Sequence, residues 1–105
     1  MSSNKTMFSI GEQIRSLREK LKLSLREVGE SMAIDASLLG KIERNERQPT
    51  KEQIKLIAEF YKLDEHTLLI ENLSDQLAFK IIEADANLEI LKFAEQKVKY
   101  LIKNK

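Results

Sequence analysis

The chain has 105 residues, a mass of 12.2 kDa and a formal net charge of +1 at pH 7, a size typical of one domain with a small appendage. Charged residues make up 33% of it, and no apolar run approaches the roughly 20 residues that cross a bilayer, so we expect no membrane partner. The absence of cysteine excludes disulfides and thiolate metal sites, and a cytoplasmic protein is the simplest interpretation.

The composition favours an all-α fold, because turn-forming residues are scarce: there are three glycines and one proline. Residues 1–8 are expected to form an arm ahead of the first helix. Ser9 and Glu12 stand three residues apart, as do Ser24 and Glu27, which is the spacing of a capping box at the start of each of two helices. Apolar residues follow each box at helical spacing: Ile10, Ile14, Leu17 and Leu21 in the first helix, and Leu25, Val28 and Met32 in the second.

A turn over residues 33–35 and a helix over residues 36–44 come next, with Asp35 as the N-cap of that helix. Gly29 lies inside the preceding helix, where glycine costs about 1 kcal/mol relative to alanine. We expect its missing side chain to let another helix approach closely. Asn45 is the predicted terminator, since Asn tolerates the left-handed conformation nearly as well as Gly.

Two more helices complete the predicted N-terminal domain. Thr50 and Gln53 form a third capping box, which opens a fourth helix. Asp64 caps a short fifth helix that carries Leu68 and Leu69.

A break in the chain is predicted at residues 71–74, where Asn72 and Ser74 are residues that commonly cap helices. The break divides the chain into a five-helix domain, residues 1–71, and a C-terminal extension, residues 72–105.

The extension is expected to contain two helices, residues 74–84 and 88–103. In the second of these helices, Leu91, Ala94, Val98 and Leu101 recur at alternating spacings of three and four in a short heptad-like seam, which covers too few heptads for a stable coiled coil. We interpret residues 74–103 as a homodimer interface. Its residues are Leu77, Ile81, Leu88, Leu91, Val98 and Leu101. The alternative is that these helices fold back and only enlarge the core.

Two short helices joined by a tight turn make a helix-turn-helix when the second can enter a DNA major groove. In the helix over residues 36–44, Leu39 and Ile42 are expected to face inward. The outer face is small in its first half and basic in its second: Ala36, Ser37, Gly40, Lys41 and Arg44. Small residues permit close approach to base edges. The alternative is a solvated face that carries two positive charges.

Several motifs occur at characteristic separations: Ile10-Gly11, Arg15 to Arg18, Leu23-Ser24, Ile42-Glu43-Arg44-Asn45 and Pro49. Through them, residues 10–69 resemble the lambda/434-type phage repressor domains, the Cro/C1 or XRE-type helix-turn-helix family. The resemblance implies a five-helix DNA-binding domain, with double-stranded DNA as the partner.

The resemblance also implies a role for each matched position. Arg18 and Glu43 match a pair that forms an internal salt bridge. The positions that meet base edges are Ala36, Ser37 and Lys41. The positions that contact phosphate are Ser24, Leu25, Gly40, Arg44, Arg47 and Lys51.

Three positions depart from the family pattern: Leu25 stands where Gln is common, Ala33 where Gly is usual in the turn, and Ala36 where Arg or Gln often reads a base. These departures imply weak bidentate reading at the start of the recognition helix. We therefore expect specificity to depend on Lys41, on Arg44 and on DNA shape.

The sequence thus predicts a DNA-binding transcriptional regulator, a repressor that binds a palindromic operator as a homodimer. The alternative is an antitoxin-like protein that neutralises a protein partner through its C-terminal helices. No nucleophile motif or phosphate-binding loop is present, and His66 is the only histidine, so we expect neither an enzyme nor a metal site or cofactor.

Overall fold

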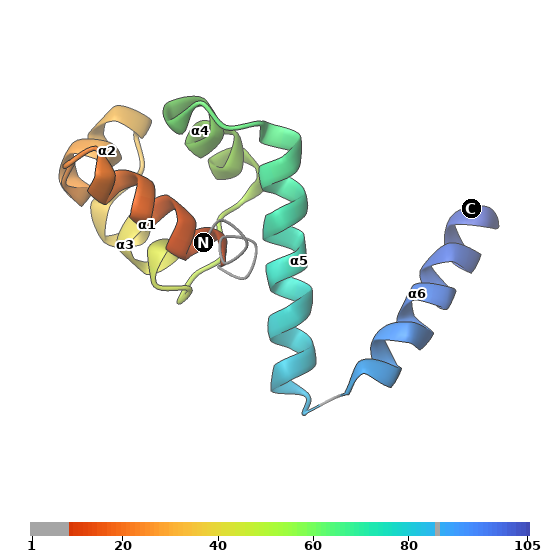
Figure 1. Cartoon of the computed structure of the whole chain (residues 1–105). Helices are drawn as coiled ribbons and strands as arrows, with labels where there is room; N and C mark the ends of the chain where they lie inside the picture. Colours follow the sequence, from red (N-terminus) through yellow and green to blue (C-terminus); the bar gives the residue numbers. More distant parts are fainter. Residues whose placement is uncertain (1–8, 86) are drawn as a thin grey trace. The chain divides into compact units, whose positions relative to one another are not determined.

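The computed structural model describes residues 9–85 and 87–105, and the arm expected at residues 1–8 lies outside them. The described residues form helices and no strand, so the predicted all-α class is confirmed (Figure 1). The helices are α1 (Ile10–Lys20), α2 (Leu25–Met32), α3 (Ala36–Glu43), α4 (Lys51–Tyr61), α5 (Glu65–Glu83) and α6 (Leu88–Lys103). The chain divides into two compact units, residues 1–75 and 76–105.

Side-chain caps fix where the helices begin. In all three predicted capping boxes the cap hydroxyl accepts a hydrogen bond from the backbone N–H three residues on, at 3.0–3.2 Å. The side chain of that third residue accepts in return from the N–H of the cap residue. The carboxylate of Asp35 accepts from the N–H groups of Ser37 and Leu38 at the start of α3. These local bonds make the helix starts readable from sequence.

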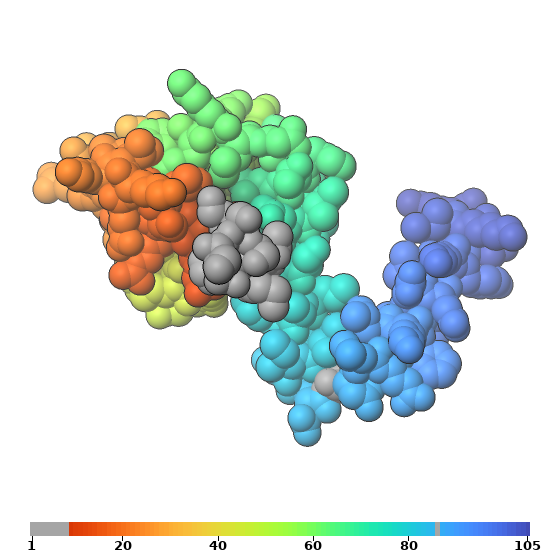
Figure 2. Space-filling model, viewed as in Figure 1, coloured from red at the N-terminus to blue at the C-terminus, as the bar shows by residue number. Residues whose placement is uncertain are grey.

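The core of the first unit is built from one face of each helix. Its largest fully buried side chains are Ile14, Val28, Leu39, Ile42, Ile54 and Ile57. Each contributes about 1.5–3 kcal/mol through burial. Helix α3 packs against α1 and α2, and α2 also packs against α4, while Leu68 of α5 completes the core. Figure 2 shows the outer surface of the chain in the same view and colours as Figure 1.

Helix α5 runs unbroken through the predicted break, so the separate helices expected before and after residues 71–74 are wrong (Figure 1). Asn72 caps nothing; it lies inside α5 and is 2% exposed. The Oδ2 atom of Asp75 accepts a hydrogen bond from the backbone N–H of Ile10, at 2.7 Å. Burial of Leu68 in the core, together with this bond, outweighs the weak helix preference of Asn and Ser.

Candidate nucleic-acid interface

The turn between α2 and α3 is tight because two residues adopt unusual roles. Ala33, the C-cap of α2, lies in the left-handed region at φ 56° and ψ 39°. Ile34 then enters the core, and its carbonyl oxygen lies 2.6 Å from where a Cβ on Gly29 would stand. The close approach expected at Gly29 is therefore made by the turn that leads into α3, and it fixes the angle between the two helices.

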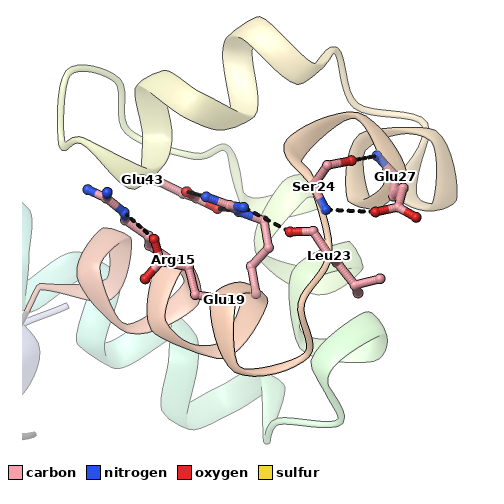
Figure 3. A network of polar contacts seen from close by, with 7 residues as sticks. Arg15, Glu19, Leu23, Ser24, Glu27 and Glu43 are labelled. Atoms are coloured by element: carbon pink, nitrogen blue, oxygen red, sulfur yellow. Dashed lines mark hydrogen bonds and ion pairs between the residues drawn. The ribbon is translucent and has the colours of Figure 1, made fainter.

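An ion pair holds the end of α3 to α1. Arg18 donates from Nε to Glu43 Oε2 at 2.8 Å and from Nη2 to Glu43 Oε1 at 3.0 Å. Its Nη1 donates to the backbone carbonyl of Leu23 at 2.9 Å, just ahead of α2 (Figure 3). The carboxylate raises the pKa of Arg18, so the guanidinium stays charged. One side chain thus ties together α1, α3 and the segment that leads into α2.

The two faces of α3 differ as the sequence indicates. Leu39, Ile42 and Glu43 are buried, whereas Ser37 and Lys41 are exposed and Ala36 is half-buried. The helix ends at Glu43, one residue earlier than expected, and Asn45 follows in the left-handed region as predicted. The exposed face is small at its start and carries a cation near its end.

Gly40 is buried, although we expected it on the open outer face. A Cβ there would lie 3.2 Å from Arg44 Nη1 and 3.3 Å from Leu25 Cδ1. The missing side chain gives room to two neighbouring side chains, which cover the position. Gly40 therefore lies beneath the surface of α3, and a phosphate would meet the covering side chains first.

Two carboxylates next to the predicted DNA contacts, Glu27 and Glu46, are not predicted from the sequence to belong to the site. Glu27 accepts from the backbone N–H of Ser24, at 2.8 Å, and this bond lowers the pKa of Glu27 (Figure 3). Glu46 accepts from Arg44 Nε at 3.0 Å, and the pair lowers the pKa of Glu46. The capping-box spacing points to the first; the second depends on how the chain turns after α3, for which no sequence signal is evident.

The other predicted phosphate contacts are exposed cations. Arg47 lies in the loop before the buried Pro49, and Lys51 is the first residue of α4. Neither of them, nor Lys41, forms an ion pair within residues 9–85 and 87–105. These three side chains keep their charge available for an external anion.

The predicted dimer residues lie in the second unit. Leu77, Leu88, Leu91, Val98 and Leu101 are between 38% and 74% exposed, and Ile81 is half-buried. No residue of α6 is buried among those that the structure describes. Apolar side chains are thus presented to solvent along α6.

Helix α3 packs against α2, follows it after a tight turn, and is held at its end by an ion pair. Its outer face is small and basic. These features define a helix-turn-helix domain of the DNA-binding kind. The family comparison agrees: a helix-turn-helix family model (HTH_3) matches residues 14–68. The chain belongs to this family, the XRE-type DNA-binding transcription regulators.

One solved structure shows that the likeness extends beyond the DNA-binding unit. A chain of a complex between the SinR protein and the SinI protein has the same fold, with a TM-score of 0.53 and 22% identity over 90% of this chain and 98% of that one. No curated protein matches the chain. Within the described residues, no helix is long and apolar enough to span a membrane, and no group of three or more His, Asp or Glu residues could hold a metal ion.

Proposed function

We propose that this protein is a cytoplasmic repressor that binds a palindromic operator as a homodimer. Helix α3 of each copy enters a major groove, and the two helices stand about 34 Å apart, one turn of DNA. The observation that carries the proposal is the set of exposed, unpaired cations that accompanies the small outer face of α3. These cations are Lys41, Arg47 and Lys51.

Base reading is assigned to the exposed side of α3. Ala36 can pack on a thymine methyl group, Ser37 can pair with more than one base, and Lys41 can donate to guanine. None of these is a bidentate reader as strong as Arg on guanine. Specificity therefore also depends on how readily the DNA deforms.

Phosphate contacts supply most of the affinity and make it depend on salt. They are assigned to Arg44, Arg47 and Lys51, and to Ser24 and Leu25 at the N-terminus of α2, where backbone N–H groups favour an anion. The carboxylate of Glu27 already occupies the N–H of Ser24. We therefore expect this contact to be weaker than those of the loop and α4. Gly40 contributes by giving Arg44 and Leu25 room.

Dimerisation is assigned to the second unit because monomeric proteins seldom expose so many large apolar side chains together. Pairing of two copies through α6 and the end of α5 covers them. It also gives two copies of α3 related by a two-fold axis, which matches a palindromic site.

A binding selection on random duplex DNA at two salt concentrations tests the proposal, with sedimentation analysis of the same protein. We expect a symmetric site, two half-sites one helical turn apart and a dimer. Leu91→Glu with Leu101→Glu should give a monomer that binds one half-site weakly, whereas Glu95→Lys on the polar side of α6 should not. A monomer with no preferred site would reject the proposal.

A second candidate is an interaction protein that neutralises a partner through residues 76–105. The exposed apolar side chains of α6 favour it, as does the likeness to a chain from a complex of two different proteins. A chain that stays monomeric and becomes stable only with a co-encoded protein would favour this candidate over the repressor.

A further inference from the structure

Among the cations assigned to the DNA interface, Arg44 is the one that forms an ion pair in the part of the chain that the structure describes. Its Nε donates to Glu46 Oε2 at 3.0 Å, and its Nη2 donates to Glu46 Oε1 at 3.4 Å. The guanidinium also lies against Gly40, with Nη1 3.2 Å from the position of a Cβ there. Arg44 is thus held along the surface of α3 by a residue two positions further on.

The pair has the geometry that a phosphate would use. Two carboxylate oxygens face two guanidinium nitrogens, which is the forked arrangement that arginine also makes with two phosphate oxygens. Both side chains are about half-exposed, at 52% and 55%, so an anion can reach the guanidinium from solvent. Exposed pairs are weak, and a duplex that carries many phosphates can displace one carboxylate.

We propose that Glu46 acts as an internal competitor of DNA phosphate, which holds Arg44 until a duplex replaces it and so limits binding to DNA of any sequence. This rests on the proposed function, because it concerns the same interface. Once displaced, the Glu46 carboxylate stands beside the DNA backbone and repels it. Both effects lower affinity for random DNA, where no base contact compensates them.

The test uses the full chain and two duplexes, one of random sequence and one carrying the selected site. Glu46→Gln should bind the random duplex about three- to tenfold more tightly at low salt, in line with one exposed ion pair plus one repulsive charge. Its preference for the selected site should fall. Glu19→Gln is the matched control, because Arg15 and Glu19 form a similarly exposed pair at 3.1 Å on α1; it should leave both affinities unchanged.

A variant in which both Glu46 and Arg44 are changed distinguishes competition for Arg44 from a general repulsion between Glu46 and DNA. Most of the gain from Glu46→Gln should disappear when Arg44 is also changed to Gln. An equal gain with and without Arg44 would overturn the proposal, as would unchanged or weakened binding by Glu46→Gln. A wild-type chain that binds neither duplex would reject the proposed function itself.

A measurement without DNA distinguishes failure of the proposed competition from failure of the proposed DNA-binding function. Inorganic phosphate is added while the Nε–Hε resonance of Arg44 is followed by NMR. Phosphate should perturb this resonance at several-fold lower concentration in Glu46→Gln than in the wild type or Glu19→Gln. Identical titrations in all three proteins would overturn the competition.

Discussion

The carboxylate of Glu43 is 4% exposed and receives two hydrogen bonds from Arg18, across 25 residues of sequence. Removing one partner of a buried ion pair leaves the other charge buried without a partner. This costs about 3–5 kcal/mol, more than the pair itself contributes. Arg18→Ala should therefore lower the free energy of unfolding by that amount. Urea denaturation measures it.

The exposed pair on the same helix provides the comparison. Arg15→Ala removes the partner of Glu19, which is open to solvent, and should change stability by less than about 0.5 kcal/mol. Replacing Arg18 and Glu43 together by Met and Leu should be much milder than Arg18→Ala alone. Equal losses from Arg15→Ala and Arg18→Ala would contradict the buried clamp.

Gly29 and Gly40 should respond differently to alanine. A Cβ at Gly29 meets a backbone carbonyl at 2.6 Å, so α3 or the turn must shift; we expect a loss of about 1–3 kcal/mol. A Cβ at Gly40 meets only the ends of two flexible side chains, and the helix gains up to about 1 kcal/mol from alanine. Thermal unfolding of both variants measures the two changes in stability. A similar loss of stability at both sites would contradict the different surroundings of Gly29 and Gly40.

Ala33→Gly should stabilise the protein. A left-handed conformation costs an L-residue about 1–2 kcal/mol, and the greater freedom of glycine in the unfolded chain returns part of that difference. The expected net gain is about 0.5–1 kcal/mol, seen as a higher urea midpoint with an unchanged slope. Ala36→Gly, in the helical conformation, should act in the opposite direction. A destabilised Ala33→Gly would show that this turn carries no strain.

Charge removal on the groove side should separate DNA binding from folding. Arg47→Ala with Lys51→Ala should leave stability within about 0.5 kcal/mol, because both side chains are exposed and unpaired. If each contacts one phosphate, the slope of log affinity against log salt should fall by about 0.9 per residue. Fluorescence anisotropy at several salt concentrations measures it, and an unchanged slope would remove these residues from the interface.

Tyr61 gives a pH-dependent prediction. Burial, aided by the negative charge of Glu43, raises the pKa of Tyr61 to about 12. A raised pKa in the folded state means that stability from this group is fully present below the unfolded value of about 10 and is lost as pH rises through 12. In Tyr100→Phe, absorbance at 295 nm should therefore rise only near pH 12. Ionisation near pH 10 before unfolding would contradict this environment.

The features readable from sequence are those fixed by neighbours along the chain. The three capping boxes and the inward positions of α3 follow from spacings of three and four residues, and the structure has them as predicted. The continuity of α5 was missed because Asn72 and Ser74 resemble caps locally. The helical state of this segment depends on burial of Leu68 in the core and on the bond from the N–H of Ile10 to Asp75, and both involve helices that lie far away in sequence.

The same limit applies to the DNA-binding site. Sequence reasoning names Arg44 as a cation of the interface, but its carboxylate partner depends on the path of the chain after α3. Likewise, Gly40 looks exposed on a helical projection, and only packing shows that Leu25 and Arg44 cover it. The inward and outward positions of α3 follow mostly from the helical pattern, whereas the contacts between neighbouring side chains on its surface do not.

The continuity of α5 has a consequence for how this protein can change. Because one helix supplies both Leu68 to the first unit and Leu77 to the second, no loop separates the two units at which a sequence could be inserted or exchanged. An insertion of one residue within α5 would rotate the α5 residues beyond it by about 100° around the helix axis, relative to those before it. The α5 residues that complete the core and the α5 residues assigned to pairing therefore keep one register along a single helix, which an insertion between Leu68 and Leu77 would change.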